Sequence, residues 1–409
     1  MNQGLRISAG ELQEMLASPE VDGDELSEQF ALIAWSVICE PGDALAGLLV
    51  RWLGATKALE CLIENTSAGA MQQLLLDSGC EFNELSHWGN FANTYSESRQ
   101  RWMPRLQLAK VKKAIEQIGV VGGSVITRRH EHWPVQLSDL AMSEPFALWV
   151  RGSTKQLLNT QHSAAIVGSR GASSYGEYVT GDLVRELVAN RFAVISGGAY
   201  GIDAVAHREA LGYNGSTIAV MAGGLDAFYP RGNHALLSRI AEQCAVIAEV
   251  PPGMAPTKWR FLQRNRLIAA LAQSVTVVEA NWRSGAINTV SHAEALEREI
   301  FAVPGPVTSP KSAGTNRLIA DLRAKLIVDA NDLMHQLSGR MLTQPTLSGL
   351  GSLEIRALDA IGFGSLELAE ICSAAGLTRD EARIALGSLE LDGLVVRRSN
   401  AWVKQQTTV

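Results

Sequence analysis

Short apolar runs alternate with segments of helical periodicity between residues 163 and 335. Because the runs of Val, Ile and Ala contain few polar residues, they are typical of strands buried on both faces of a parallel sheet. The predicted strands are residues 164–168, 193–196, 217–221, 245–250, 275–279 and 300–304. The predicted helices between them are residues 175–190, 201–212, 233–243, 261–273 and 285–299. This alternation predicts an α/β core with a Rossmann-like parallel sheet over 163–335, whose ligands are expected outside the carboxyl ends of the strands.

Residues 1–119 have a different pattern, in which apolar positions recur at helical spacing with no strand between them. Pro41-Gly42-Asp43 provides a turn and a helix start within this region. The predicted helices are residues 30–35, 44–53, 58–63 and 105–118. We therefore expect an all-α module over 1–119. A connector over 120–162 follows, with short predicted strands at 122–127 and 146–152.

The C-terminal part of the chain is predicted to be a separate small domain. Residues 336–351 are rich in Ser, Gly, Thr and Pro and are typical of a linker. Residues 352–409 read as three helices followed by an apolar strand, a polar turn and a second strand, which predicts a winged helix. The acidic pair Asp380 and Glu381 begins the third helix. Since winged helices that grip DNA usually present a basic recognition helix, this pair favours protein contact or regulation.

Composition narrows the functional classes. The chain of 409 residues carries 36 Lys and Arg against 42 Asp and Glu, a net charge of −6, so any nucleic-acid binding requires a local basic patch. Its five cysteines are scattered and lack metal-ligand spacing, which indicates reduced thiols in the cytoplasm. There is no apolar run of about 18 residues and no signal-peptide pattern, so no membrane association is expected. We predict no cofactor, metal site or catalytic constellation, because none of the usual motifs is present.

Two turns that follow predicted strands combine small residues with a helix start. Gly168-Ser169-Arg170 follows the first strand, and 196–203 (Ser-Gly-Gly-Ala-Tyr-Gly-Ile-Asp) follows the second. Backbone N–H groups and a helix N-terminus attract anions, and an arginine adds a bidentate fork. The same Gly-Ser pattern also occurs in ordinary βα turns, and Asp203 fits a structural role as a first-turn acid. Neither turn has the spacing of a dinucleotide or P-loop motif.

The densest cationic stretch is residues 258–266, Lys-Trp-Arg-Phe-Leu-Gln-Arg-Asn-Arg, which contains no acid. In a helix, Arg260 and Arg264 share one face, one turn apart. Interleaved aromatic and basic side chains are typical of surfaces that track phosphates and stack on bases. The alternative is a solvated helix start whose aromatic residues pack inward. We favour the binding role because the stretch is expected at the same sheet edge as Arg170. Arg283-Ser284-Gly285-Ala286 begins a further helix that suits an anion.

Read together, these turns resemble the DNA-processing protein A family, also called Smf. The matching pieces occur in the family's order and cover about 150 residues. They are 168–170, 196–203, Tyr229-Pro230 with Asn233, 251–253, Phe261 with 264–266, 284–286, 303–305 and 314–316. The flanking modules also fit, because the family joins a helical module similar to a sterile-alpha-motif (SAM) domain to a winged helix.

The resemblance implies a protein that is not an enzyme, that binds single-stranded DNA and that is typically a homodimer. Such proteins act as recombination mediators that help to load the RecA recombinase on incoming DNA in natural transformation. The candidate DNA-binding residues are Gly168, Ser169, Arg170, Gly197, Gly198, Tyr200, Gly201, Lys258, Arg260, Arg264, Asn265, Arg266, Ser284 and Gly285.

One residue departs from the family pattern. Many members have Lys or Arg where this chain has Tyr200, so a phosphate contact is replaced either by stacking on a base or by weaker binding with a flatter salt dependence. Two other classes remain open. One is a Rossmann-fold nucleotide-binding hydrolase, although Ala222-Gly223-Gly224 stands where such enzymes have a Pro-Gly-Gly turn and a catalytic Glu. The other is a scaffold protein that binds a small anion.

Overall fold

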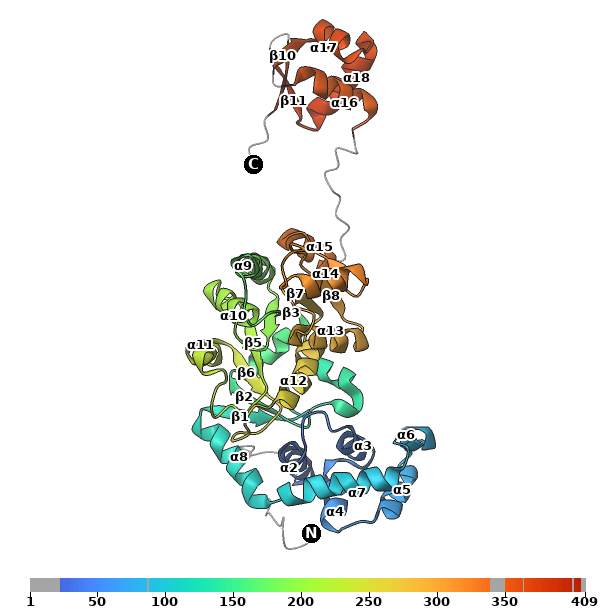
Figure 1. The fold of residues 1–409 in the computed structure, drawn as a ribbon, viewed down its shortest axis with the longest axis vertical. Helices are drawn as coiled ribbons and strands as arrows, with labels where there is room; N and C mark the ends of the chain where they lie inside the picture. Colours follow the sequence, from blue (N-terminus) through green and yellow to red (C-terminus); the bar gives the residue numbers. More distant parts are fainter. Residues whose placement is uncertain (1–22, 87, 339–349, 363, 399–400, 406–409) are drawn as a thin grey trace. The chain divides into compact units, whose positions relative to one another are not determined.

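The computed structural model describes residues 23–86, 88–338, 350–362, 364–398 and 401–405. The chain divides into two compact units, residues 1–339 and residues 340–409. The larger unit contains the N-terminal helices and one sheet, and the smaller unit is a winged helix (Figure 1). Most of the predicted linker, 339–349, lies outside the described residues.

The described part of the N-terminal region, from residue 23 to residue 120, consists of helices and loops, as the sequence predicts, while residues 1–22 of the predicted module lie outside the described residues. Gly54 separates two of its helices and has a φ of +80°, a conformation in which glycine is favoured. The helix predicted from residue 105 begins only at Leu108, because a short 3₁₀ turn containing Pro104 precedes it. The helices are α2 (Gly23–Ile38), α3 (Ala44–Leu53), α4 (Ala55–Ile63), α5 (Ala68–Asp77), α6 (Phe82–Ser86), α7 (Phe91–Trp102) and α8 (Leu108–Val120).

A nine-stranded sheet forms the centre of the larger unit, in the order β1-β2-β6-β5-β4-β3-β7-β8-β9. The strands from β3 to β9 are parallel, whereas β1 and β2 add an antiparallel edge. The strands of the predicted connector therefore belong to the central sheet. The strands are β1 (Gly123–Ile126), β2 (Leu148–Gly152), β3 (Ser163–Val167), β4 (Ala193–Ser196), β5 (Thr217–Met221), β6 (Ala245–Ala248), β7 (Ser274–Val277), β8 (Glu299–Ala302) and β9 (Lys325–Leu326).

Helices cover both faces of the sheet, which explains why its strands are uniformly apolar. Along β3, Ala164 and Ile166 pack against α9 and α10, while Ala165 and Val167 pack against α12 and α13. Figure 1 shows these two helix layers on opposite sides of β3 and β7. The helices are α9 (Ser174–Ala189), α10 (Ile202–Gly212), α11 (His234–Gln243), α12 (Lys258–Leu271), α13 (Gly285–Ala295), α14 (Ala313–Ala320) and α15 (Ala330–Ser338).

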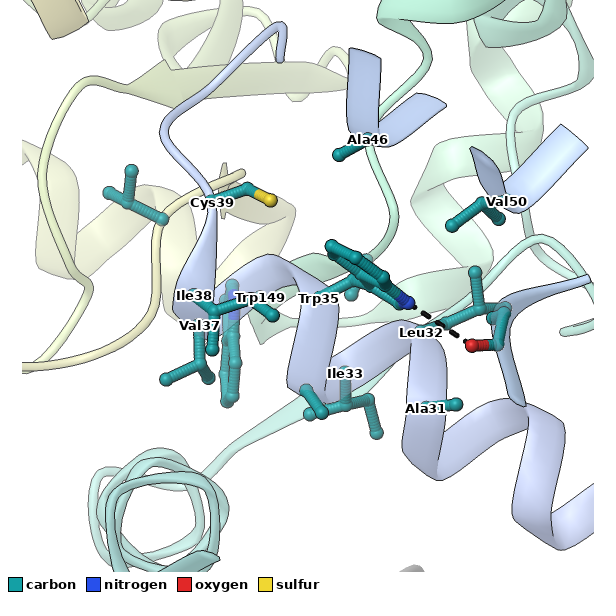
Figure 2. Packing of buried hydrophobic residues seen from close by; sticks show 14 of the residues in the cluster. Ala31, Leu32, Ile33, Trp35, Val37, Ile38, Cys39, Ala46, Val50 and Trp149 are labelled. Atoms are coloured by element: carbon teal, nitrogen blue, oxygen red, sulfur yellow. Dashed lines mark hydrogen bonds between the residues drawn. The ribbon is translucent and has the colours of Figure 1, made fainter. Parts of the chain in front are cut away.

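The N-terminal helices share a hydrophobic core with the edge of the sheet. Trp35 is fully buried, donates from Nε1 to the carbonyl of Ala55 at 3.1 Å and meets Trp102 edge to face at 5.4 Å. Figure 2 shows Trp149 of β2 beside Ile38 of α2 in the same cluster. This helical region and the sheet are therefore packed together rather than merely tethered.

The smaller unit has the predicted winged-helix architecture. Three helices enclose an apolar core that includes Ala357, Ile371 and Leu386. The short strand β10, which the sequence pattern did not predict, completes the order β10-β12-β11, and residues 399–400 between the two predicted strands lie outside the described residues. The elements are α16 (Ser352–Ile361), β10 (Ser365–Glu367), α17 (Leu368–Ala375), α18 (Arg379–Leu391), β11 (Val395–Arg398) and β12 (Ala401–Lys404).

Candidate functional site

A pocket of about 700 Å³ opens at the carboxyl ends of the central strands. In the sheet, β3 lies between β4 and β7, so the strand order reverses direction at this point. Ligands of open α/β sheets bind at such switch points because the loops on either side diverge there. Eight of the predicted site residues line the pocket, namely Gly168, Ser169, Arg170, Lys258, Arg264, Asn265, Ser284 and Gly285.

The loop after β3 forms one wall of the pocket. Gly168 is required by close packing, because a Cβ at this position would lie 2.6 Å from Ile202 Cγ1. Arg170 is exposed, and its guanidinium carbon lies 5.0 Å from the centre of the Phe261 ring, within cation–π range. This loop therefore presents a cation and an aromatic face side by side.

The loop after β4 supports the first loop rather than offering amides to a ligand. The amides of Gly197 and Ala199 donate to the carboxylate of Asp203, at 3.2 and 3.4 Å. Asn233 also holds this loop in place, because its Nδ2 donates to the carbonyl of Gly198 at 3.0 Å. Asp203 thus has the structural role that the sequence favoured. Gly197 and Gly198 do not line the pocket.

Gly201 and Tyr200 also lie outside the pocket lining. Gly201 has a φ of +74°, and a Cβ there would collide with the carbonyl oxygen of Ser169. Its role is to let the two loops approach each other closely. The Tyr200 hydroxyl accepts a hydrogen bond from the amide of Gly232 at 3.2 Å, and the side chain is 47% exposed. Its ring is accessible but is not among the residues that line the pocket.

The basic segment 258–266 forms the first part of α12, and its cations point in different directions. The structure brings Lys258 and Arg264 to the pocket but directs Arg260 and Arg266 away from it. The helical spacing predicted that Arg260 and Arg264 share one face of the helix, and both were predicted to bind DNA. Arg260 instead forms a two-pronged ion pair with Glu40, with N–O distances of 2.9 Å. The physical reason is that α12 is covered by the N-terminal helical region on that side.

Arg266 is also paired with an acidic residue away from the pocket. It is 3% exposed and pairs with the buried carboxylate of Glu249, whose Oε1 also accepts the amide of Gly42 at 3.3 Å. Burial raises the pKa of Glu249, and the neighbouring Arg266 opposes that shift. Arg260 and Arg266 therefore fasten α12 to the loop between α2 and α3. Neither guanidinium is available to a ligand in the pocket.

Arg264 forms the floor of the pocket. Its guanidinium donates to the carbonyl of Gly197 at 2.6 Å and to that of Val220, and it contacts the face of Gly197 where a side chain would stand. Burial lowers the pKa of Arg264 to about 10, while the carboxylate of Asp203 opposes the shift. Arg264 is therefore still cationic at neutral pH, and it projects positive charge through the floor.

The N-termini of two long helices open on the pocket. Thr257 caps α12 by accepting from the amide of Arg260 at 3.2 Å, and Ser284 caps α13 by accepting from the amide of Ala286 at 3.3 Å. Asn265 links the two, because its Nδ2 donates to the carbonyl of Gly285 at 3.2 Å. Each helix N-terminus contributes partial positive charge, which favours an anion between them.

The structure adds lining residues that the sequence analysis did not select as site residues. Phe261 provides an accessible aromatic face, and Arg283 adds an exposed cation beside α13. Arg283 directly precedes the predicted helix start at Ser284, so its position was the available signal. The lining then contains four cations, Arg170, Lys258, Arg264 and Arg283, against the single carboxylate of Asp203. This local excess of positive charge is the basic patch that a chain of net negative charge needs in order to bind a nucleic acid.

A buried histidine beneath the floor makes stability depend on pH. His207 of α10 is fully buried, and its Nδ1 lies 2.8 Å from Thr217 Oγ1. Thr217 donates its own proton to the carbonyl of Val194, so Nδ1 of His207 carries a hydrogen and donates it to Thr217 Oγ1. Burial, aided by the nearby Arg264, lowers the pKa of His207 to about 3. The folded protein therefore resists protonation that the unfolded chain accepts.

We expect the free energy of unfolding to fall as pH decreases below about 6.5, by about 1.4 kcal/mol per pH unit from this residue. The unfolded chain gains a proton there, whereas folded His207 remains neutral until about pH 3. Denaturant titrations at several pH values should show that His207→Gln removes this part of the slope. An identical slope in both proteins would contradict the assignment.

Two further properties of the described residues concern metal ions and membranes. No group of three or more His, Cys, Asp or Glu side chains in these ranges is placed to hold a metal ion. No helix among the described residues is long and apolar enough to cross a membrane.

The larger unit is a doubly wound, Rossmann-type domain with a cationic switch-point pocket, and the smaller unit is a winged helix. Residues 124–338 match the family model described as DNA recombination-mediator protein A, and residues 342–400 match the DprA winged helix domain. The chain belongs to the DNA recombination-mediator protein A family.

Relatives and solved structures agree with this membership. A Mycobacterium tuberculosis protein that carries the DNA processing protein DprA name is 39% identical over 326 residues, which cover 75% of this chain and 83% of that protein. The DNA processing protein DprA of Bacillus subtilis is 33% identical over 234 residues, or 57% of this chain and 77% of that protein. The crystal structure of DNA processing protein A from Streptococcus pneumoniae aligns with a TM-score of 0.58 and 26% identity, covering 81% of this chain and 98% of that one.

Proposed function

We propose that the protein binds single-stranded DNA in the switch-point pocket. The observation that carries the proposal is the convergence of Arg170, Lys258 and Arg283 with two helix N-termini around one accessible aromatic ring, Phe261. Cations that follow a backbone, combined with an aromatic platform for bases, are the usual means of binding a single strand without reading its sequence. Membership of a DNA recombination-mediator family supports the same ligand.

We propose that the pocket binds the DNA strand and breaks no bond in it. The only carboxylate among the pocket-lining residues is Asp203, and two loop amides already donate to it. Burial raises the pKa of Asp203, while the adjacent Arg264 opposes that shift. Its hydrogen bonds give it a positioning role in the loop, so we assign no enzymatic step to it. The hydrolase and anion-scaffold alternatives become outcomes of the binding test.

The wider role follows from the resemblance described above. We propose a homodimer in the cytoplasm that acts as a recombination mediator and helps to load RecA on incoming DNA in natural transformation. The winged helix is proposed to contact protein or to regulate. Its Asp380 is exposed, whereas Glu381 completes a capping box with Thr378. A helix that starts with these acids is poorly suited to a phosphate backbone.

Salt dependence tests the proposed ligand. We expect the logarithm of the binding constant for a thymidine oligomer of about six nucleotides to fall with the logarithm of salt concentration, with a slope of about 2 to 3. Each phosphate engaged on a single strand contributes about 0.7, and four cations line the pocket. Fluorescence anisotropy over a salt series would measure the slope.

Mononucleotides and duplex DNA serve as comparison ligands in the same assay. Tighter binding of mononucleotides than of oligomers would favour the anion-scaffold alternative. Release of free base from a nucleotide panel would establish the hydrolase instead. Either result would contradict the proposal.

A further inference from the structure

A second cationic region lies in the N-terminal helical region. Between Glu97 and Glu116 the chain has six cations and no acid, in a protein whose net charge is −6. The six cations are Arg99, Arg101, Arg105, Lys110, Lys112 and Lys113. The function proposed above does not use any of them.

These cations are not all equally available. Arg99 donates to the side chain of Asn65, and Arg105 pairs with Glu40 at 2.8 Å. By contrast, Lys110 and Lys113 of α8 are exposed, and the Nζ of Lys110 donates to the carbonyl of Pro104 at 3.2 Å. We call Lys110 and Lys113, together with Arg105 just before α8, the basic ridge.

The ridge is connected to the pocket at one end through a shared carboxylate. Oε1 of Glu40 accepts from Arg105 at 2.8 Å and from Arg260 at 2.9 Å. Arg260 lies in the first turn of α12, two residues from Lys258 of the pocket lining. The hydrogen bond from Lys110 to the carbonyl of Pro104 then joins α8 to the Arg105 end of the ridge.

The ridge also approaches the pocket along α8 itself. Lys110, Lys113 and Gln117 are spaced i, i+3 and i+7, so they follow one side of the helix. Gln117 Oε1 lies 3.6 Å from the position of a Cβ on Gly253. That glycine belongs to the loop that continues through Pro256 and Thr257 into the pocket wall. At about 1.5 Å per residue, the 13 residues of α8 span about 20 Å.

We infer that the basic ridge is a second contact for the same single strand of DNA, binding its phosphate backbone where the strand leaves the pocket past α12. This inference rests on the function proposed above. Exposed lysines suit phosphates rather than bases, so the ridge adds affinity and salt dependence but no sequence preference. Two acids flank this path: Glu116 on α8, and Asp226, which accepts the amide of Gly253 at 2.7 Å. Glu116 lies one turn from Lys113 on the same side of α8, so the ridge stays positive there because its two lysines outnumber this acid.

The test compares the double variant Lys110→Gln/Lys113→Gln with the unchanged protein on two thymidine oligomers. One oligomer of about six nucleotides fills the pocket only, and the other of about thirty extends beyond it. We expect the variant to bind the long oligomer about two- to thirtyfold more weakly, with a salt slope reduced by about 1.4. Binding of the short oligomer should not change.

The matched control is Lys57→Gln/Lys155→Gln, which removes the same charge from exposed lysines outside the pocket lining. Long-oligomer binding by this control should equal that of the unchanged protein. The ridge proposal is overturned if the ridge variant keeps the full affinity and slope, if both oligomers weaken equally, or if the control weakens as much. If the unchanged protein binds neither oligomer, the proposed function itself fails, which is a different result.

Discussion

Replacing Arg264 with alanine is expected to lower the free energy of unfolding of the larger unit by about 3 to 5 kcal/mol. The guanidinium is buried, donates to the carbonyls of Gly197 and Val220, and lies beside the buried Asp203. Its removal leaves that acid without its nearest opposite charge and leaves both carbonyls without these donors. Denaturant unfolding of the full chain, followed by circular dichroism, would measure the change.

A double-mutant cycle with Gly197 separates this contact from general damage to the fold. A Cβ at Gly197 would meet the Arg264 guanidinium, so Gly197→Ala alone is expected to cost about 1 to 3 kcal/mol through overpacking. When Arg264 is already alanine, that collision is absent. The combined loss should therefore be smaller than the sum of the two by about 0.5 to 3 kcal/mol. Simple additivity would show that the two residues do not meet as described.

Arg170→Ala is expected to weaken binding of a thymidine oligomer by about 1 to 3 kcal/mol, or about 5- to 150-fold. Arg170 is exposed at the pocket wall and lies over Phe261, where it can contact a phosphate while a base stacks nearby. Because no described hydrogen bond within the protein depends on its side chain, the free energy of unfolding should change by no more than about 0.5 kcal/mol. Filter binding and denaturant unfolding of the same preparation would give both values.

Arg239→Ala is the matched control for this variant, since Arg239 is an exposed arginine of α11 outside the pocket lining. Its oligomer affinity should equal that of the unchanged protein. If Arg170→Ala also retains full affinity, the pocket is not where the strand binds. Arg264→Ala is less suitable for this purpose, because the expected loss of stability would accompany any loss of binding.

Much of the fold could be predicted because burial on both faces leaves a clear pattern. Uniform Val, Ile and Ala runs locate β3 to β8 to within a few residues, and the helical repeats between them locate α9 to α13. The two strands of the predicted connector were also predicted, but their pairing within the central sheet was not. Strand pairing is a long-range property: Trp149 pairs with Ala248, and no local feature of either segment specifies that partner.

The candidate site was predicted in part for a related reason. Parallel strands deliver their carboxyl ends to one edge, so the turns at 168–170 and 284–285 could be expected to converge. The role of the 197–201 turn could not be predicted in the same way. Its small residues indicate that something approaches the backbone closely, but this can be either a ligand or another loop. Here the loop at Ser169 packs against Gly201, and the amides of Gly197 and Ala199 donate to Asp203.

The sequence by itself determined the alternation of strands and helices, the separate winged helix, and the concentration of cations at 258–266, because each is written in local pattern and composition. Only the tertiary structure decided which of those cations face a ligand. Arg260 and Arg264 are one turn apart on α12, yet Arg260 is paired with Glu40, 220 residues away in the chain. The reason is physical: a buried guanidinium must find a partner, and its partner is set by whichever segment packs against the helix.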